Sequence, residues 1–214
     1  CKPEPVVRDG NTLLVLGKDY TLAYKNNVNV GTGLVTVKGK GNYTKTMTLE
    51  FSIIPKSLED EDIELSVPDC KYTGKSCKPQ PTIKWGKNTL KAGKDYTVSF
   101  RNNIEKDEAD SAVRPTVTIT GKGNYTGVVI ENFHIYDTAT SGFVVTALEK
   151  QTYTGLIVEP VVEVYASKSA QANGEVLNAG VDYTVSYENN VKVGKGKAII
   201  TGLGQYGGSK TVTF

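Results

Sequence analysis

Gly17-Lys18-Asp19-Tyr20-Thr21 begins a motif that continues with Asn26-Asn27 and ends with Gly39-Lys40-Gly41-Asn42-Tyr43. The motif occurs twice more, at Gly93–Thr97, Asn102-Asn103 and Gly121–Tyr125, and at Gly180–Thr184, Asn189-Asn190 and Gly202–Tyr206. A period of about 80 residues matches one small β domain, so the sequence predicts a tandem array and not one large fold. We place the modules at residues 1–55, 56–137 and 138–214.

The first module is expected to be truncated at its N-terminus. Cys1-Lys2-Pro3 aligns with Cys77-Lys78-Pro79, and the stretch Ile63–Ser76 has no counterpart before Cys1. We therefore expect the chain to be a piece of a longer polypeptide. A mature lipoprotein also begins with Cys, but the repeat register favours the first interpretation.

Composition and charge exclude two classes of function. The net charge is +2 and 22% of residues are charged, so there is no basic field that would indicate nucleic-acid binding. No apolar run approaches the roughly 18 residues that span a bilayer, and no signal peptide is visible. We therefore expect neither nucleic acid as a partner nor membrane insertion of this chain.

The cysteines predict one disulfide. Cys70 and Cys77 flank a six-residue turn, and the third module has Gln151 and Val158 at these two positions, so both cysteines are missing together. Joint loss is expected of a bonded pair, whereas zinc would need about four ligands that one His and three Cys in different modules do not supply. A Cys70–Cys77 disulfide indicates an oxidising, extracellular compartment. Cys1 is then the orphan of a pair whose partner lies upstream.

Each module is predicted to consist of short strands joined by tight turns. In Thr46–Ile53 the apolar residues Met47, Leu49, Phe51 and Ile53 alternate with polar ones, as in a half-buried strand. The Asn-Asn and Gly-x-Gly-Asn segments supply positive-φ positions for turns, and no window shows a helical pattern of useful length. We therefore predict an all-β fold of immunoglobulin-like β-sandwich modules in an extended array.

The repeated pattern also resembles a known repeat type. Gly-Lys-Asp-Tyr-Thr, Asn-Asn and Gly-Lys-Gly-Asn-Tyr-Thr-Gly resemble the immunoglobulin-like tandem repeats of secreted or cell-wall-anchored proteins of Gram-positive bacteria, many from gut Clostridia. They are loosely similar to the MBG modules of bacterial adhesins. The resemblance covers nearly the whole chain. It implies stalk, spacer or adhesive modules at the cell surface or cell wall, and it carries no catalytic residue or cofactor to transfer.

Two features of the sequence bear on possible chemistry. His134 is the only histidine and aligns with Ser52, outside the apolar alternation, so we interpret it as an exposed strand residue and not as an acid–base group. Glu59-Asp60-Glu61-Asp62 lies where the first two modules meet. We favour a solvated acidic linker, because the run lacks the spaced ligands and the Gly of a dedicated calcium-binding loop. A calcium site at this junction remains an alternative.

Recognition is expected where the modules differ. Trp85 aligns with Asp9 and Ala166, and a position that accepts all three is not expected in a packed core. An exposed Trp is a candidate interface residue, although it can also lie flat over Lys stems. The second and third modules carry insertions at 105–110 and 167–174. The candidate ligand-binding residues are therefore Trp85, Glu105, Asp107, Glu108, Asp110, Lys168 and Asn173.

The sequence thus predicts a non-catalytic, monomeric region of a bacterial surface protein. We expect it to act in adhesion to a host or cell-surface protein or glycan, or as a stalk that displays other domains. One alternative is direct binding of a host glycoprotein or an immunoglobulin. A second is carbohydrate binding within a secreted glycan-degrading enzyme, which would need a row of exposed aromatic residues.

Overall fold

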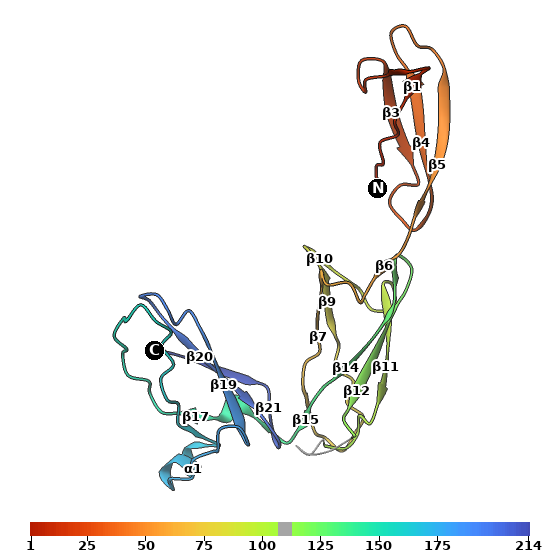
Figure 1. The fold of residues 1–214 in the computed structure, drawn as a ribbon. Helices are drawn as coiled ribbons and strands as arrows, with labels where there is room; N and C mark the ends of the chain where they lie inside the picture. The colour runs from red at the N-terminus through yellow and green to blue at the C-terminus, as the bar shows by residue number, and fades with distance from the viewer. Residues whose placement is uncertain (107–112) are drawn as a thin grey trace. The chain divides into compact units, whose positions relative to one another are not determined.

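The computed structural model describes residues 1–106 and 113–214, and these are dominated by β-strands (Figure 1). Helical structure within the described residues consists of the 3-10 turn η1 (Thr140–Gly142) and the short helix α1 (Lys168–Ala172). The predicted all-β class is confirmed. The chain divides into two compact units, which comprise Cys1–Ile63, Leu90–Thr97 and Ile119–Val129 in the first, and Glu64–Thr89, Val98–Thr118 and Ile130–Phe214 in the second.

A three-stranded sheet of the same order recurs in each repeat of the sequence motif. The first and third of these sheets are antiparallel throughout. The strand predicted at Thr46–Ile53 is present with those bounds. The sheets are β3 (Tyr20–Lys25), β4 (Gly31–Gly39) and β5 (Thr46–Ile53); β11 (Tyr96–Arg101), β12 (Thr116–Gly121) and β14 (Val128–Asn132); and β19 (Tyr183–Glu188), β20 (Lys197–Gly202) and β22 (Ser209–Thr213).

Shorter strands form the remaining pairs. β1 (Arg8–Asp9) pairs with β2 (Thr12–Leu13), and β10 (Asn88–Thr89), β9 (Thr82–Trp85) and β7 (Ile63–Ser66) form a sheet in that order. Three parallel pairs are β6 (Lys56–Ser57) with β13 (Tyr125–Thr126), β8 (Cys70–Lys71) with β15 (Ile135–Tyr136), and β16 (Thr138–Ala139) with β21 (Tyr206–Gly207). β17 (Val144–Val145) pairs antiparallel with β18 (Val164–Tyr165).

One strand departs from its predicted burial. The alternation in β5 predicted that Met47, Leu49, Phe51 and Ile53 all face a core. Phe51 and Ile53 are half-buried, but Met47 and Leu49 are exposed. The alternation is correct, but the first half of the strand faces a hollow in the surface and not packed protein.

The residues shared by all three repeats build the scaffold. The first Asn of each Asn-Asn pair has a positive φ, at 51° for Asn26, 53° for Asn102 and 54° for Asn189, as the turn prediction required. The repeated Asp accepts a hydrogen bond on Oδ2 from the backbone N–H four residues earlier. The three bonds are Val15 to Asp19 (2.9 Å), Lys91 to Asp95 (2.8 Å) and Asn178 to Asp182 (2.8 Å).

Small cores form around the tyrosine that follows this Asp. Tyr20, Tyr96 and Tyr183 are all buried, and each lies at the first position of its sheet's first strand. In the third repeat the core cluster consists of Phe143, Val162, Val164, Tyr183, Ala198, Ile200 and Tyr206. A core of this size buries little apolar surface, as is usual for a small domain.

Candidate functional site

The turn between Cys70 and Cys77 is closed by two of the predicted site residues. The two cysteines form a disulfide with a Cα–Cα distance of 6.2 Å, so the predicted pairing is confirmed. Cys1 is free and exposed. A disulfide persists in an oxidising environment, which is consistent with the expected extracellular compartment.

The second Asn of each Asn-Asn pair clamps the chain at this same turn. Asn103 Nδ2 donates to the carbonyl of Cys77 at 2.5 Å, and the Cys77 N–H donates to the carbonyl of Asn103 at 2.7 Å. Asn190 makes the same two bonds with Val158, at 3.0 and 2.9 Å. Cys1 is held in the same way by Asn27. These contacts match the predicted alignment of Cys1, Cys77 and Val158.

Trp85 is 40% exposed at the end of β9, where it pairs with Asn88 across the turn to β10. Its counterpart Asp9 is exposed as well. However, Ala166 is half-buried and packs against the third core, so the inference that this position lies outside a core in every module is wrong. Because alanine is small, the side chain of Ala166 is partly buried in the third repeat, whereas the larger side chain of Trp85 stays at the surface. The role of Trp85 in ligand binding stays a prediction.

The insertion of the second module is described only at its start. Glu105 is exposed, whereas Asp107, Glu108 and Asp110 lie outside the described residues. The neighbouring Lys106 forms an ion pair with Asp137 at 2.6 Å, and its ammonium lies 5.3 Å from the centre of the Tyr72 ring. This cation links the insertion to the Cys70–Cys77 turn, which contains Tyr72.

The insertion of the third module contains a helix that the sequence did not predict. Ser167 caps α1 by accepting a hydrogen bond from the Ala170 N–H at 3.1 Å, and Ala170 is buried. Lys168 is exposed, and the exposed Asn173 donates to Glu175 at 3.1 Å. With five residues, α1 is too short for a periodic pattern to be recognised, and Ser167 was the only local signal.

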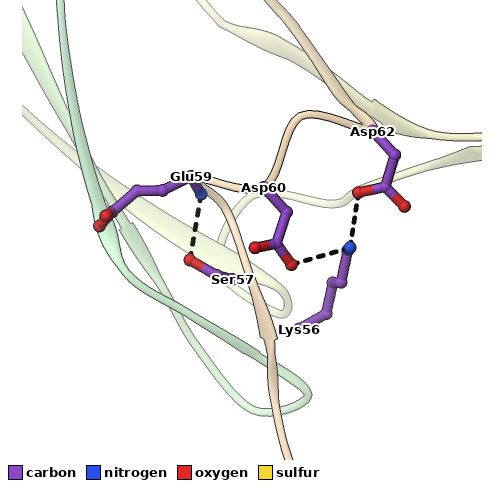
Figure 2. Close-up of polar contacts among 5 residues, drawn as sticks. All are labelled: Lys56, Ser57, Glu59, Asp60 and Asp62. Carbon is purple, nitrogen blue, oxygen red and sulfur yellow. Dashed lines mark hydrogen bonds and ion pairs between the residues drawn. The ribbon is translucent and has the colours of Figure 1, made fainter.

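The acidic run is organised by a lysine (Figure 2). Lys56 Nζ lies 2.8 Å from Asp60 Oδ2 and 2.5 Å from Asp62 Oδ1. The hydrogen bond to Asp60, and after it the one to Asp62, raises the pKa of the Lys56 ammonium. Glu59 Oε1 accepts a hydrogen bond from the Val128 N–H at 3.0 Å. The Lys56 ammonium neutralises the negative charge of Asp60 and Asp62 that would attract a calcium ion. The arrangement therefore supports an ion-paired linker. Within residues 1–106 and 113–214, no group of three or more His, Cys, Asp or Glu could hold a metal ion.

His134 is not an exposed strand residue. It is half-buried between strands β14 and β15, and its Nε2 lies 3.1 Å from the carbonyl oxygen of Tyr206. The sequence prediction was wrong here because the alignment with Ser52 gave no information on a partner 72 residues away.

A further surface was missed by the sequence analysis. A hollow of about 530 Å³ in the third repeat lies beside the turn that replaces the disulfide. Leu156 and Ile157 in this turn are 72% and 67% exposed, where the second module has Lys75 and Ser76. Among the residues that line the hollow are Leu148, Tyr153, Val158, Val193 and Phe214. The apolar pair Leu156-Ile157 in place of Lys75-Ser76 was the available signal.

Comparison with known proteins leaves this chain without a match. No family model matches it, and no curated protein or solved structure does so either. Within the described residues, no helix has both the length and the apolar character needed to cross a membrane.

Proposed function

We propose that this chain is a non-catalytic extracellular repeat region of a bacterial surface protein, built of tandem immunoglobulin-like β-sandwich modules. It acts in adhesion or as a stalk that displays other domains. The observation that carries the proposal is how the repeated residues are used. Asp19, Asp95 and Asp182 bond the backbone, and the Asn pairs form and clamp turns. Polar residues used in this way repeat because every module needs the same frame.

Several residues that differ between the repeats lie at the surface, which supports a frame that presents variable loops. Trp85, Glu105, Lys168 and Asn173 are exposed, and so are Leu156 and Ile157. Surface loops on a rigid frame are where binding residues are usually found. The disulfide fits an oxidising location outside the cell.

Small-angle X-ray scattering tests the stalk. A compact globule of this length has a radius of gyration of about 17 Å. We expect a clearly larger value and a distance distribution with a long tail for the full chain. A value near that of the compact globule would contradict an extended array.

A second candidate function is direct binding of a host protein by the third module. The observation that favours it is the exposed apolar turn at Leu156 and Ile157, because exposed apolar patches often mark interaction surfaces. The test is capture from host serum and mucus on the immobilised full chain, with a glycan array alongside. Leu156→Lys/Ile157→Ser copies the second module at this turn, and Trp85→Ala removes the other candidate.

Loss of a captured protein with Leu156→Lys/Ile157→Ser, but not with Trp85→Ala, would assign binding to the third module. Loss with Trp85→Ala alone would assign it to the second. Binding to the glycan array that depends on Trp85 would favour carbohydrate recognition instead. An unchanged pattern with both variants would contradict both binding assignments and leave the stalk function.

A further inference from the structure

In the second module, one segment pairs at two separate edges. β6 (Lys56–Ser57) runs parallel to β13, and the N–H groups of Lys56 and Leu58 donate to the carbonyls of Asn124 and Thr126 at 3.0 and 2.8 Å. Leu58, the next residue, is only 3% exposed. The segment then continues into β7, which lies beside β9 in its sheet.

The third module repeats this arrangement with different residues. β16 runs parallel to β21, and the Gln205 carbonyl accepts from the Asp137 and Thr138 N–H groups, both at 3.0 Å. Thr140, which corresponds to Leu58, is buried, and so is Phe143. The segment then forms β17, which pairs antiparallel with β18. Two modules therefore use one extended segment in the same way.

In the first module both of these edges lack a partner strand within the described residues. β1 (Arg8–Asp9), the counterpart of β9, pairs with β2 alone. Tyr43 and Thr44, the counterparts of β13, lie outside any strand. An unpaired strand edge is a ready template for another segment.

The two open edges meet at one hollow. Arg8, Asp9, Tyr43 and Thr44 all line a cavity of about 630 Å³, together with the apolar side chains of Val7, Leu14, Val37, Met47 and Leu49. The first half of β5 lies along this cavity, and its side chains Met47 and Leu49 are 61% and 38% exposed.

Several of the corresponding positions in the other modules are more deeply buried. Ile83 and Leu90, the counterparts of Val7 and Leu14, are buried, whereas Val7 and Leu14 are half-buried. Val212, the counterpart of Leu49, packs against the third core. Val7, Leu14 and Leu49 are therefore apolar side chains that are more exposed than Ile83, Leu90 and Val212, their counterparts.

We propose that this hollow is an acceptor site for an extended polypeptide segment with the pattern of residues 56–66. The segment pairs in parallel with Tyr43–Thr44, places one apolar side chain in the hollow as Leu58 does, and pairs with the open edge of β1. Addition of a strand to a sheet edge derives affinity from main-chain hydrogen bonds and specificity from side-chain pockets. A polypeptide is the occupant because two main-chain edges converge here, and a small apolar ligand would leave both of them unpaired.

A peptide of residues 55–67 tests the site. Labelled at its N-terminus and titrated with the full chain, it is expected to bind saturably with one site per chain. Leu58→Asp in the peptide is expected to weaken binding about tenfold or more, since a carboxylate replaces the inserted apolar group. Absence of saturable binding, or equal binding of the Leu58→Asp peptide, would overturn the proposal.

Two exposed substitutions in the chain provide a matched pair. Met47 lines the hollow, and Met47→Glu is expected to abolish peptide binding. Ile130 on β14 is exposed to a similar extent, and Ile130→Glu is expected to leave binding unchanged. Both side chains are exposed, so neither change disturbs a core, and far-ultraviolet circular dichroism verifies folding. Equal loss with both variants would overturn the assignment to this hollow.

Hydrogen exchange locates the bound peptide. Peptide binding is expected to slow exchange in residues 5–9 and 42–46, and to leave their counterparts 81–85 and 124–128 unchanged, because those edges are already paired. Protection elsewhere would overturn the site. If the chain instead dimerises with increasing concentration, protects the same residues and excludes the peptide, the occupant is a second copy and the proposed occupant is wrong.

Discussion

The second and third modules have equivalent turns, and the turn of the second module follows β8. An equivalent asparagine holds each turn, but the other contacts of the two turns differ. Asn103 and Asn190 each make two backbone-linking hydrogen bonds, to Cys77 and Val158 respectively. Only the second turn has the disulfide, and only the third exposes an apolar pair. The comparison shows that the same asparagine contact holds the last residue of the turn with and without a disulfide. We therefore expect the disulfide to add stability to a contact that does not require it.

The largest expected effect comes from removing the disulfide. Cys70→Ser/Cys77→Ser is expected to lower the free energy of unfolding of the second module by about 2–3 kcal/mol, since a short closed ring no longer restricts the unfolded chain. Native-state hydrogen exchange at β12 and β20 reports the second and third modules separately. The effect should be confined to β12. An equal decrease at β20 would contradict the view that the third turn is independent of the disulfide.

Removal of the clamp should be the next largest effect, and it should be unequal between the modules. Asn190→Ala leaves the Val158 carbonyl without its side-chain donor and is expected to cost the third module about 1–2 kcal/mol. Asn103→Ala should cost the second module less, because the disulfide still holds the turn. The difference should disappear when Asn103→Ala is combined with Cys70→Ser/Cys77→Ser, a coupling that a double-mutant cycle measures. Equal costs in the oxidised proteins would contradict the comparison.

A tyrosine beside the clamp provides a smaller test with a pH dependence. Tyr187 OH donates to the Pro160 carbonyl at 2.6 Å, whereas the second module has Phe100 there, which packs edge-on against Phe133. Burial raises the pKa of the Tyr187 phenol, and the Glu159 carboxylate and Tyr183 add to this. Tyr187→Phe is expected to cost about 1 kcal/mol at neutral pH through the lost hydrogen bond.

The sign of the pH effect follows from the raised pKa. The stabilising contribution of the Tyr187 phenol is fully present below the ordinary tyrosine pKa of about 10. It is lost as the pH rises through the pKa of the folded state. The third module should therefore lose stability above about pH 10, and Tyr187→Phe should make that loss shallower. Denaturant unfolding followed at β20 between pH 8 and 11 measures it. A steeper alkaline loss in the variant would contradict the assignment.

The sequence predicted what repeats and missed what depends on distant contacts. The all-β class, the strand at 46–53, the positive-φ asparagines and the Cys70–Cys77 bond all followed from local pattern or repeat register. The exposure of Met47 could not be predicted, because alternation reports which side chains share a face but not whether that face is covered. The predictions for His134 and Ala166 were wrong for the same reason, because residues far away in sequence determine how buried these two side chains are.

The smallest expected effect on stability concerns the apolar pair in the third turn. Leu156→Lys/Ile157→Ser gives this turn the residues of the second module, and it is expected to change the free energy of unfolding by less than about 0.5 kcal/mol, because exposed side chains contribute little to folding. The variant should bind less of an apolar fluorescent dye than the original chain, in proportion to the apolar surface removed. Hydrogen exchange at β20 and a dye titration measure the two quantities on one preparation. Unchanged stability with reduced dye binding would identify the pair as surface available for a partner. A decrease in stability of 2 kcal/mol or more would instead show that Leu156 and Ile157 support the turn in place of the missing disulfide.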